Sequence, residues 1–137
     1  MIDTLPTHAR IATETIRPRG RAALIALWTT QVALAALFLM AGGSKLAGAP
    51  AMVNLFKAVG IGQWFRYVTG TIEIASAIAL LMPAAAAFGS LLLIPTLVGA
   101  VLTNVFILHV SPAMPLVLLL GVAAVAWVRR DQIPFVK

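Results

Sequence analysis

The chain has no cysteine, only four acidic residues among 137 and only two histidines. Without thiols it cannot form disulfides, thiolate metal sites, iron–sulfur clusters or a cysteine nucleophile. Asp3, Asp131 and His8 lie in the tails, so neither a Ser-His-Asp set nor a haem held by two histidines is expected in the apolar part. For the same reason we expect no metal site.

Charge is scarce as well, and apolar residues take its place. Hydrophobic residues make up 61% of the chain and charged residues 10%, against roughly 25% charged in a typical globular protein. This composition predicts an integral membrane protein. The net charge of +6 arises from residues near the chain ends and beside the apolar runs. Residues in these positions do not form a basic face that could bind nucleic acid.

Four apolar runs account for the hydrophobicity, and each is near the length of about 20 residues that a membrane-spanning helix needs. They cover residues 22–41, 65–82, about 88–110, and 111 to 130. The glycines from Gly42 onward and Pro50 are expected to end the first helix. The fourth is expected to begin with Ser111 as N-cap and Pro112, and to end at Arg129 and Arg130, which can snorkel to the interface.

A shorter segment between the first two runs has its apolar residues on one side. This pattern predicts an amphipathic helix that lies in the membrane interface. We therefore expect an all-α fold: an integral membrane four-helix bundle with a short interfacial amphipathic helix between spans one and two. Residues 1–21 would form a basic cytoplasmic tail, residues 22–130 the four-span membrane domain, and residues 131–137 a short cytoplasmic tail.

The distribution of lysine and arginine indicates the orientation. The two tails and the ends of the runs next to them carry seven lysines and arginines, and the loop between spans two and three, on the same side, carries none. The opposite side carries only Lys45, Lys57 and Arg66. The positive-inside rule then predicts a multi-pass protein of the cell (inner) membrane with both termini cytoplasmic. A cleaved signal peptide is the alternative, because the sequence Ala-Gly-Ala at 47–49 resembles a cleavage site, although the apolar run is long for that purpose.

Glu73 stands in the middle of the second apolar run. A carboxyl group at the centre of a membrane helix costs roughly 2.5 to 3.5 kcal/mol on insertion scales, so it needs a partner, a proton or a function. The structural alternative is an ion pair or hydrogen bond that only fixes helix packing. Direct pairing with Arg66 is not expected, because the two lie two turns apart and Arg66 leans away; Lys45 or a ligand is the better partner.

The predicted topology brings several polar residues to the outer half of the membrane. Lys45, Arg66, Glu73, Asn104 and His109 should all lie there, and Thr69 shares the helix face of Glu73, while Gln31 shares that of Lys45. We expect Glu73 and His109 as catalytic acid and base. The residues expected to bind substrate are Lys45, Arg66, Asn104, Gln31 and Thr69. The alternatives are snorkelling for the cations, interhelical hydrogen bonds for the amides and packing for His109.

Three short motifs resemble those of the DoxX-like family of small membrane proteins. The run LMAGGSKL over residues 39–46 is similar to the L-x-x-G-x-x-K-L end of the family's first span, and GTIE over residues 70–73 is similar to its G-x-x-E. Phe56 followed by Gly60-Ile61 resembles the segment between them. The resemblance covers roughly residues 22 to 128, and it departs at the second turn, where LLMP and four alanines replace the glycine and arginine often seen.

The resemblance implies a four-helix membrane subunit, tied in some members to thiosulfate:quinone oxidoreduction and in others to oxidative-stress complexes. The first hypothesis is therefore a subunit or small enzyme of a membrane oxidoreductase system that acts at the quinone or lipid level. Its partners would be the lipid bilayer, a membrane or peripheral redox subunit and further copies of the chain; quinone is the candidate cofactor, and none is expected to be covalently bound. The alternatives are an intramembrane isomerase or hydrolase that uses Glu73, and a scaffold or small-solute permease.

Overall fold

The computed structural model describes residues 20–133, and all regular structure in this range is helical. The helices are α2 (Arg21–Ala47), α3 (Pro50–Val59), α4 (Gln63–Leu81), α5 (Ala86–Thr103) and α6 (Ala113–Val128). A π-helical turn, η2 (Asn104–Leu108), extends α5, and a 3-10 turn, η3 (Arg130–Gln132), follows α6. The predicted all-α class is confirmed. Most of the two predicted tails lies outside the described residues.

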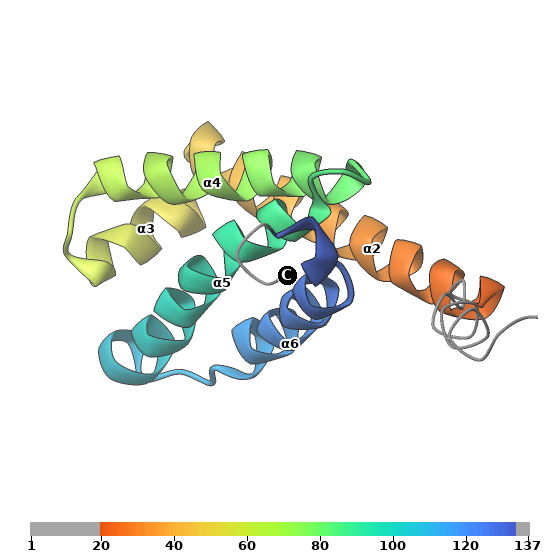
Figure 1. The fold of residues 1–137 in the computed structure, drawn as a ribbon. Coiled ribbons are helices and arrows are strands. Elements are labelled where there is room, and N and C mark those ends of the chain that lie inside the picture. Colours follow the sequence, from red (N-terminus) through yellow and green to blue (C-terminus); the bar gives the residue numbers. More distant parts are fainter. Residues whose placement is uncertain (1–19, 134–137) are drawn as a thin grey trace, which may run out of the picture.

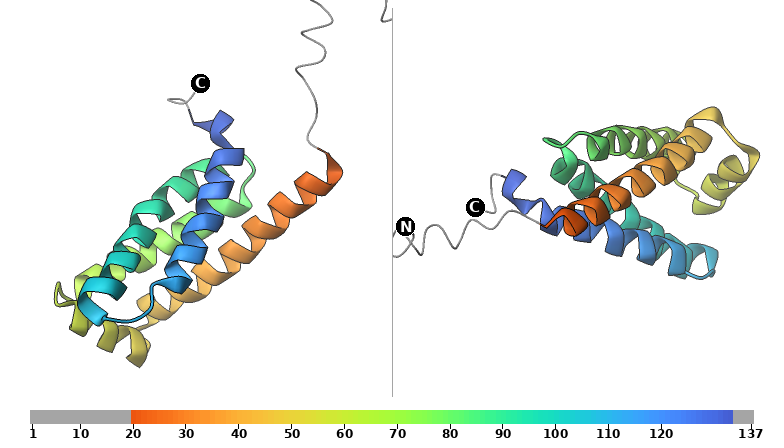
Figure 2. Two further views of the ribbon diagram at one scale, coloured as in Figure 1. Left: turned by 90° about the horizontal axis from the view of Figure 1, so that it is seen from below. Right: turned by 90° about the vertical axis from the view of Figure 1, so that its right-hand side faces the viewer.

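The four long helices pack as a bundle (Figure 1). α2 packs along α4, α4 along α5, and α5 along α6, while α6 also touches α2. Both ends of the described chain lie at one end of the bundle, which we call the tail end, and α3 lies at the opposite end, the α3 end (Figure 2). The first turns of α2 splay away from the other helices, and residues 21–26 are exposed.

Glycine and proline set the boundaries of α2 and α3. α2 continues through Gly42 and ends at Ala47, where Gly48 takes a left-handed conformation with φ 73° and donates its N–H to Lys45. The expectation that the helix stops at Gly42 was therefore wrong: a glycine with helical dihedral angles extends a helix, and only the left-handed one ends it. The predicted short helix is present as α3, which begins with Pro50 at its first position.

The fourth helix also begins slightly later than expected. Pro112 is the N-cap of α6 and Ala113 its first residue. Ser111 still caps the chain locally, because its hydroxyl accepts a hydrogen bond of 3.2 Å from the Ala113 N–H. The third helix, expected over about residues 88–110, runs from Ala86 to Leu108, and its last five residues form the π-helical turn.

The core is apolar and fills the space between the four long helices. Leu80 of α4, Leu93 of α5 and Val122 of α6 are fully buried, and Phe38 of α2 is 3% exposed. Small residues allow the helices to approach one another: a Cβ added at Gly89 of α5 would lie 2.8 Å from a carbonyl oxygen of α4. Such close contacts stabilise helix pairs by van der Waals packing where hydrophobic exclusion of water is weak.

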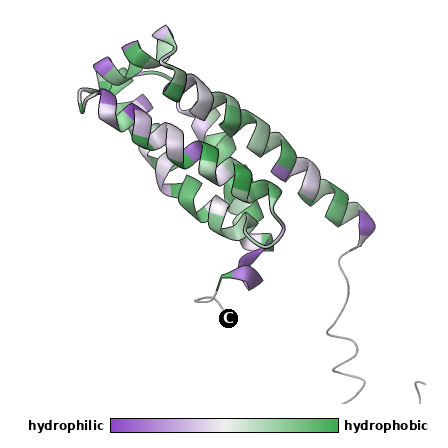
Figure 3. Ribbon diagram, turned by 90° about the horizontal axis from the view of Figure 1, so that it is seen from above, coloured by the Kyte–Doolittle hydropathy of each residue, from purple (hydrophilic) through white to green (hydrophobic). Residues whose placement is uncertain are grey.

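The outer surface of the described residues is also apolar. Met40, Phe106 and Leu120 are each about 70% exposed. Two helices, Arg21–Ala47 and Ala86–Leu108, are long and apolar enough to cross a membrane, and little of either is buried inside the bundle. Hydrophilic residues gather mainly toward the two ends of the bundle (Figure 3). A core helix of a soluble protein would be mostly buried, so this surface has the character of a membrane protein.

Candidate functional site

The contact expected between Lys45 and Glu73 is present. Lys45 lies in the last turn of α2, Glu73 lies in the middle of α4, and the Lys45 Nζ is 3.0 Å from the Glu73 Oε2. Their side chains are only 14% and 7% exposed. The contact is a charge-assisted hydrogen bond between two helices in a largely buried place.

Two glycines make this pair geometrically feasible. A Cβ added at Gly42 of α2 would lie 2.8 Å from the Gly70 carbonyl oxygen and 3.2 Å from the Glu73 Cβ. A Cβ added at Gly70 would lie 3.0 Å from the Lys45 Cβ. The two helix backbones therefore cross in close contact here, and the crossing places the lysine of one helix against the carboxylate of the other.

The pair is not saturated by protein partners. Glu73 accepts one hydrogen bond, through Oε2, and its Oε1 has no partner among residues 20–133. An ammonium group has three N–H donors, and the only one that Lys45 uses within the described chain goes to Glu73. The site thus keeps one acceptor and two donors for a ligand.

Arg66 stands beside the pair but binds elsewhere. Its Nε donates a hydrogen bond of 2.7 Å to the Gln63 Oε1, and its Nη1 donates to the Lys45 carbonyl oxygen. The guanidinium also lies 4.4 Å from the centre of the Tyr67 ring, and the residue is 4% exposed. Arg66 therefore caps the C-terminus of α2, where a positive charge is favourable. As expected, it makes no ion pair with Glu73.

The other residues expected at the α3 end do not reach the pair. Thr69 donates within its own helix, to carbonyl oxygens 3.1 and 3.2 Å away. The Asn104 Nδ2 donates to the Ser111 carbonyl oxygen, and the Asn104 backbone carbonyl accepts from the Val110 N–H. Asn104 therefore stabilises the connection between α5 and α6. His109 is exposed, with φ 52°. The η2 turn contacts α3, so Asn104 and His109 lie at the α3 end of the bundle as expected. Neither side chain forms a hydrogen bond or an ion pair with Glu73.

Gln31 belongs to a separate network at the tail end. It lies 14 residues before Lys45, or roughly 21 Å along the helix. Its Nε2 donates to the Leu80 carbonyl at 2.6 Å, and its Oε1 accepts from the Arg129 Nε at 2.9 Å. Arg129 also donates to the Pro83 carbonyl at 3.4 Å and lies over the Trp28 ring. The structure thus gives Gln31 the interhelical hydrogen bonds that were the alternative to substrate binding.

The expectation that Arg129 snorkels was wrong, since it is only 9% exposed and turns into the bundle. Its hydrogen-bond acceptors lie inside the bundle: the Gln31 Oε1 and the Pro83 carbonyl oxygen in the turn after α4, to which Gln132 also donates. Gln132 also accepts the Ala87 N–H at 3.2 Å. Sequence reasoning missed Gln132 altogether, because nothing in the local pattern of residues 130–132 shows which turn they will meet.

The sequence matches the DoxX-like family over residues 29–132. The chain belongs to the DoxX-like family. The match includes both the Lys45–Glu73 pair and the network of Gln31, Arg129 and Gln132. No curated protein matches the chain. No solved structure matches it either.

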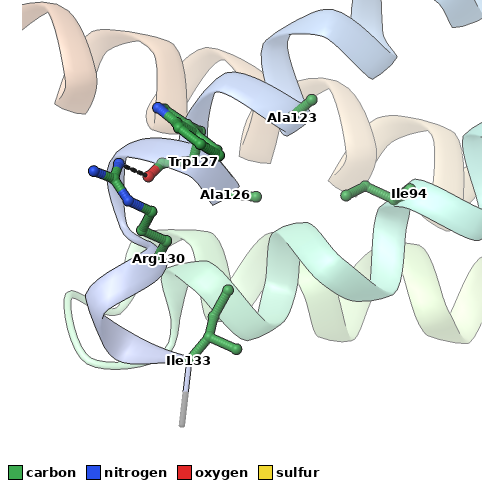
Figure 4. A pocket seen from close by; sticks show the side chains of 6 residues that line it. All are labelled: Ile94, Ala123, Ala126, Trp127, Arg130 and Ile133. Carbon is green, nitrogen blue, oxygen red and sulfur yellow. Dashed lines mark hydrogen bonds between the residues drawn. The ribbon is translucent and has the colours of Figure 1, made fainter. Parts of the chain in front are cut away.

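A third feature of this DoxX-like chain is a surface depression. It lies between α5 and α6 near the tail end (Figure 4). The six lining residues are Ile94, Ala123, Ala126, Trp127, Arg130 and Ile133. None of them belongs to the Lys45–Glu73 pair, so the depression is a separate feature.

Proposed function

We propose that this chain is a four-span subunit of a membrane oxidoreductase system, in which Lys45 and Glu73 bind a quinone and relay protons to it. The observation that carries the proposal is the buried Lys45–Glu73 contact with its unused polar atoms. A quinone is apolar over most of its surface and has two carbonyl oxygens. Its oxygen fits the free donors of Lys45, and a quinol hydroxyl fits the free Oε1 of Glu73.

Four spans are supported by the length and packing of the helices. α4 has 19 residues and carries Arg66 and Glu73, both of which turn into the bundle rather than toward its surface. α6 has 16 residues, which is roughly 24 Å of helix, and basic residues follow its end. The helix ends alternate between the tail end and the α3 end (Figure 2). The positive-inside rule then places the tail end in the cytoplasm and Lys45 in the outer half of the membrane.

The chemistry needs electrons from a second protein. Reduction of a quinone to a quinol consumes two electrons and two protons; we assign the electrons to a redox partner subunit and the proton transfer to Glu73. Lys45 would hold the quinone oxygen as negative charge develops on it. Glu73 would give its proton to that oxygen, become a carboxylate paired with Lys45, and take up a proton from water before the next transfer. A carboxyl group that can act as acid and base within hydrogen-bond reach of the substrate oxygen is what such a step requires.

Bound quinone in the purified protein tests this proposal. The full chain is extracted in mild detergent, and quinone is quantified by chromatography after solvent extraction. We expect quinone in the unaltered protein and a loss of about tenfold to a hundredfold in Lys45→Met, since a buried hydrogen bond to a charged group contributes on the order of 1.5 to 3 kcal/mol. Lys57→Met is the matched control, because Lys57 is an exposed lysine at the same end of the bundle. Absence of quinone from the unaltered protein, or equal content in both variants, would contradict the proposal.

A second candidate function is that of a scaffold, in which the pair only holds α2 against α4. The observation that favours it is the position of the pair at the glycine crossing, where Arg66 also ties the end of α2 to α4. In this case the pair contributes to stability and assembly alone. The Lys45 and Glu73 variants described in the Discussion separate the two functions.

A further inference from the structure

The depression between α5 and α6, here called the α5–α6 groove, is built almost entirely from apolar side chains. Ile94 of α5 faces the two alanines Ala123 and Ala126 of α6, and Ile133 closes the groove toward the tail end (Figure 4). The small side chains of the two alanines leave a hollow between the larger side chains of Ile94, Trp127 and Ile133. The groove is open to the outside, on a face that would meet lipid.

The groove has a single charged residue at its tail end. Arg130 donates a hydrogen bond of 2.8 Å from Nη1 to the Trp127 carbonyl, and its guanidinium lies 4.6 Å from the centre of the Trp127 ring. Arg130 forms no ion pair with a carboxylate of residues 20–133. A guanidinium has five N–H donors, so most of them remain free. Trp127 itself is 67% exposed, as is usual for tryptophan at the level of lipid headgroups.

We propose that the α5–α6 groove binds an anionic phospholipid, with one acyl chain in the groove and the phosphate on Arg130. The apolar walls fit a hydrocarbon chain, and the unpaired guanidinium beside them fits a phosphate, which arginine can bind through two parallel hydrogen bonds. Basic residues between membrane helices recognise anionic headgroups in this way. The proposal rests on the membrane embedding stated above, but not on the Lys45–Glu73 pair.

The two parts of the lipid contribute differently. The acyl chain leaves other hydrocarbon when it enters the groove, so it gains only van der Waals contact with the walls and would not distinguish one headgroup from another. The charge on Arg130 therefore determines headgroup preference. A zwitterionic lipid also has a phosphate, but its own cation offsets the charge, and we expect the anionic lipid to bind more tightly.

Native mass spectrometry of the full chain in detergent tests the headgroup. Phosphatidylglycerol and phosphatidylcholine with identical acyl chains are titrated separately. We expect tighter binding of phosphatidylglycerol, and a loss of about fivefold in Arg130→Gln, which is the effect of one basic residue near an anionic headgroup. Arg21→Gln is the control, because Arg21 is an exposed arginine at the same end of the bundle. Equal binding of the two lipids, or equal losses in the two variants, would overturn the proposal.

Two neighbouring alanines test the acyl chain. Ala123 and Ala124 are both exposed on α6, but only Ala123 lines the groove. Ala123→Phe should fill the groove and weaken both lipids, whereas Ala124→Phe should leave both unchanged. Equal lipid binding by these two variants would show that the lipid does not occupy the α5–α6 groove. The lipid titrations are repeated with Glu73→Gln, in which we expect unchanged lipid binding. This result would distinguish a failure of the quinone proposal from a failure of the lipid proposal.

Discussion

At the residue scale, Glu73 combines a structural contact with free bonding capacity. Its Oε2 meets Lys45 while its Oε1 has no partner among the described residues. A carboxylate oxygen has two lone pairs, so Oε1 can accept hydrogen bonds that no group of residues 20–133 supplies. Oε1 is therefore the atom at which a ligand or water can bind, and its role is accessible to mutation.

A pair of variants separates proton transfer from packing. Glu73→Gln keeps size and hydrogen-bonding capacity but leaves the Lys45 charge without a counter-ion, so we expect a lower free energy of unfolding. Adding Lys45→Met removes that charge and should recover part of the stability, with a coupling of roughly 0.5 to 3 kcal/mol between the two positions. Quinone-dependent activity should fall a hundredfold or more in Glu73→Gln and should not return in the double variant. Unfolding in detergent measures the free energy of unfolding, and turnover in membranes measures the quinone-dependent activity.

The outcome that favours a scaffold is equally definite. If activity and complex assembly follow stability, falling in Glu73→Gln and returning in the double variant, then the pair only holds the helices together. Glu73 would then no longer be considered a proton carrier. The amount of folded protein in each preparation is the control.

At the element scale, the crossing of α2 and α4 depends on which of two adjacent glycines faces the partner helix. Gly42 has the backbone of Gly70 2.8 Å from its ideal Cβ position, whereas Gly43 has nothing within 4 Å. Gly42→Ala should push the helices apart and lower the melting temperature. Gly43→Ala should raise stability by about 0.5 to 1 kcal/mol, because alanine favours a helix over glycine. Thermal unfolding in detergent measures both, and equal shifts would mean that the crossing is looser than described.

The same elements show how far the sequence alone could be interpreted. The Lys45–Glu73 contact was predictable, because alternating helix directions bring both residues to the same half of the membrane and about 100° per residue puts each on the polar face of its helix. The inward orientation of Arg129 was not, because its acceptors, the Gln31 side chain and the Pro83 carbonyl, lie 98 and 46 positions earlier in the chain. The extension of α2 past Gly42 was missed because the sequence does not distinguish a glycine that packs against a neighbouring helix from one that ends its own helix.

The positions of Asn104 and His109 were predictable only as far as their end of the bundle. The directions of their side chains are set by the π-helical turn and by the left-handed conformation of His109. Neither feature has a local sequence signal here. The catalytic role of His109 stays a prediction. In the structure it is exposed and in no described contact with Glu73.

At the scale of the whole molecule, the absence of cysteine provides a direct test of topology. A single cysteine introduced anywhere is the only thiol in the chain. Ala49→Cys lies between α2 and α3 at the α3 end, and Arg21→Cys lies at the tail end. If the positive-inside rule governs insertion, a membrane-impermeant maleimide should label Ala49→Cys in intact cells and Arg21→Cys only after the membrane is opened.

This labelling decides more than orientation, because Lys45 lies toward the α3 end of the bundle and Arg130 lies at the tail end. With the tail end inside, the Lys45–Glu73 pair faces the outer half of the membrane, and Arg130 faces the inner leaflet, whose anionic lipids attract basic residues. Labelling of Arg21→Cys in intact cells would reverse both placements. A substitution on the exposed face of α5, Val98→Cys, is the control: Val98 is 41% exposed in the middle of an apolar helix, and it should stay unlabelled under both conditions if lipid covers that face. Labelling of Val98→Cys would show that water reaches this surface and would contradict the membrane-spanning arrangement itself.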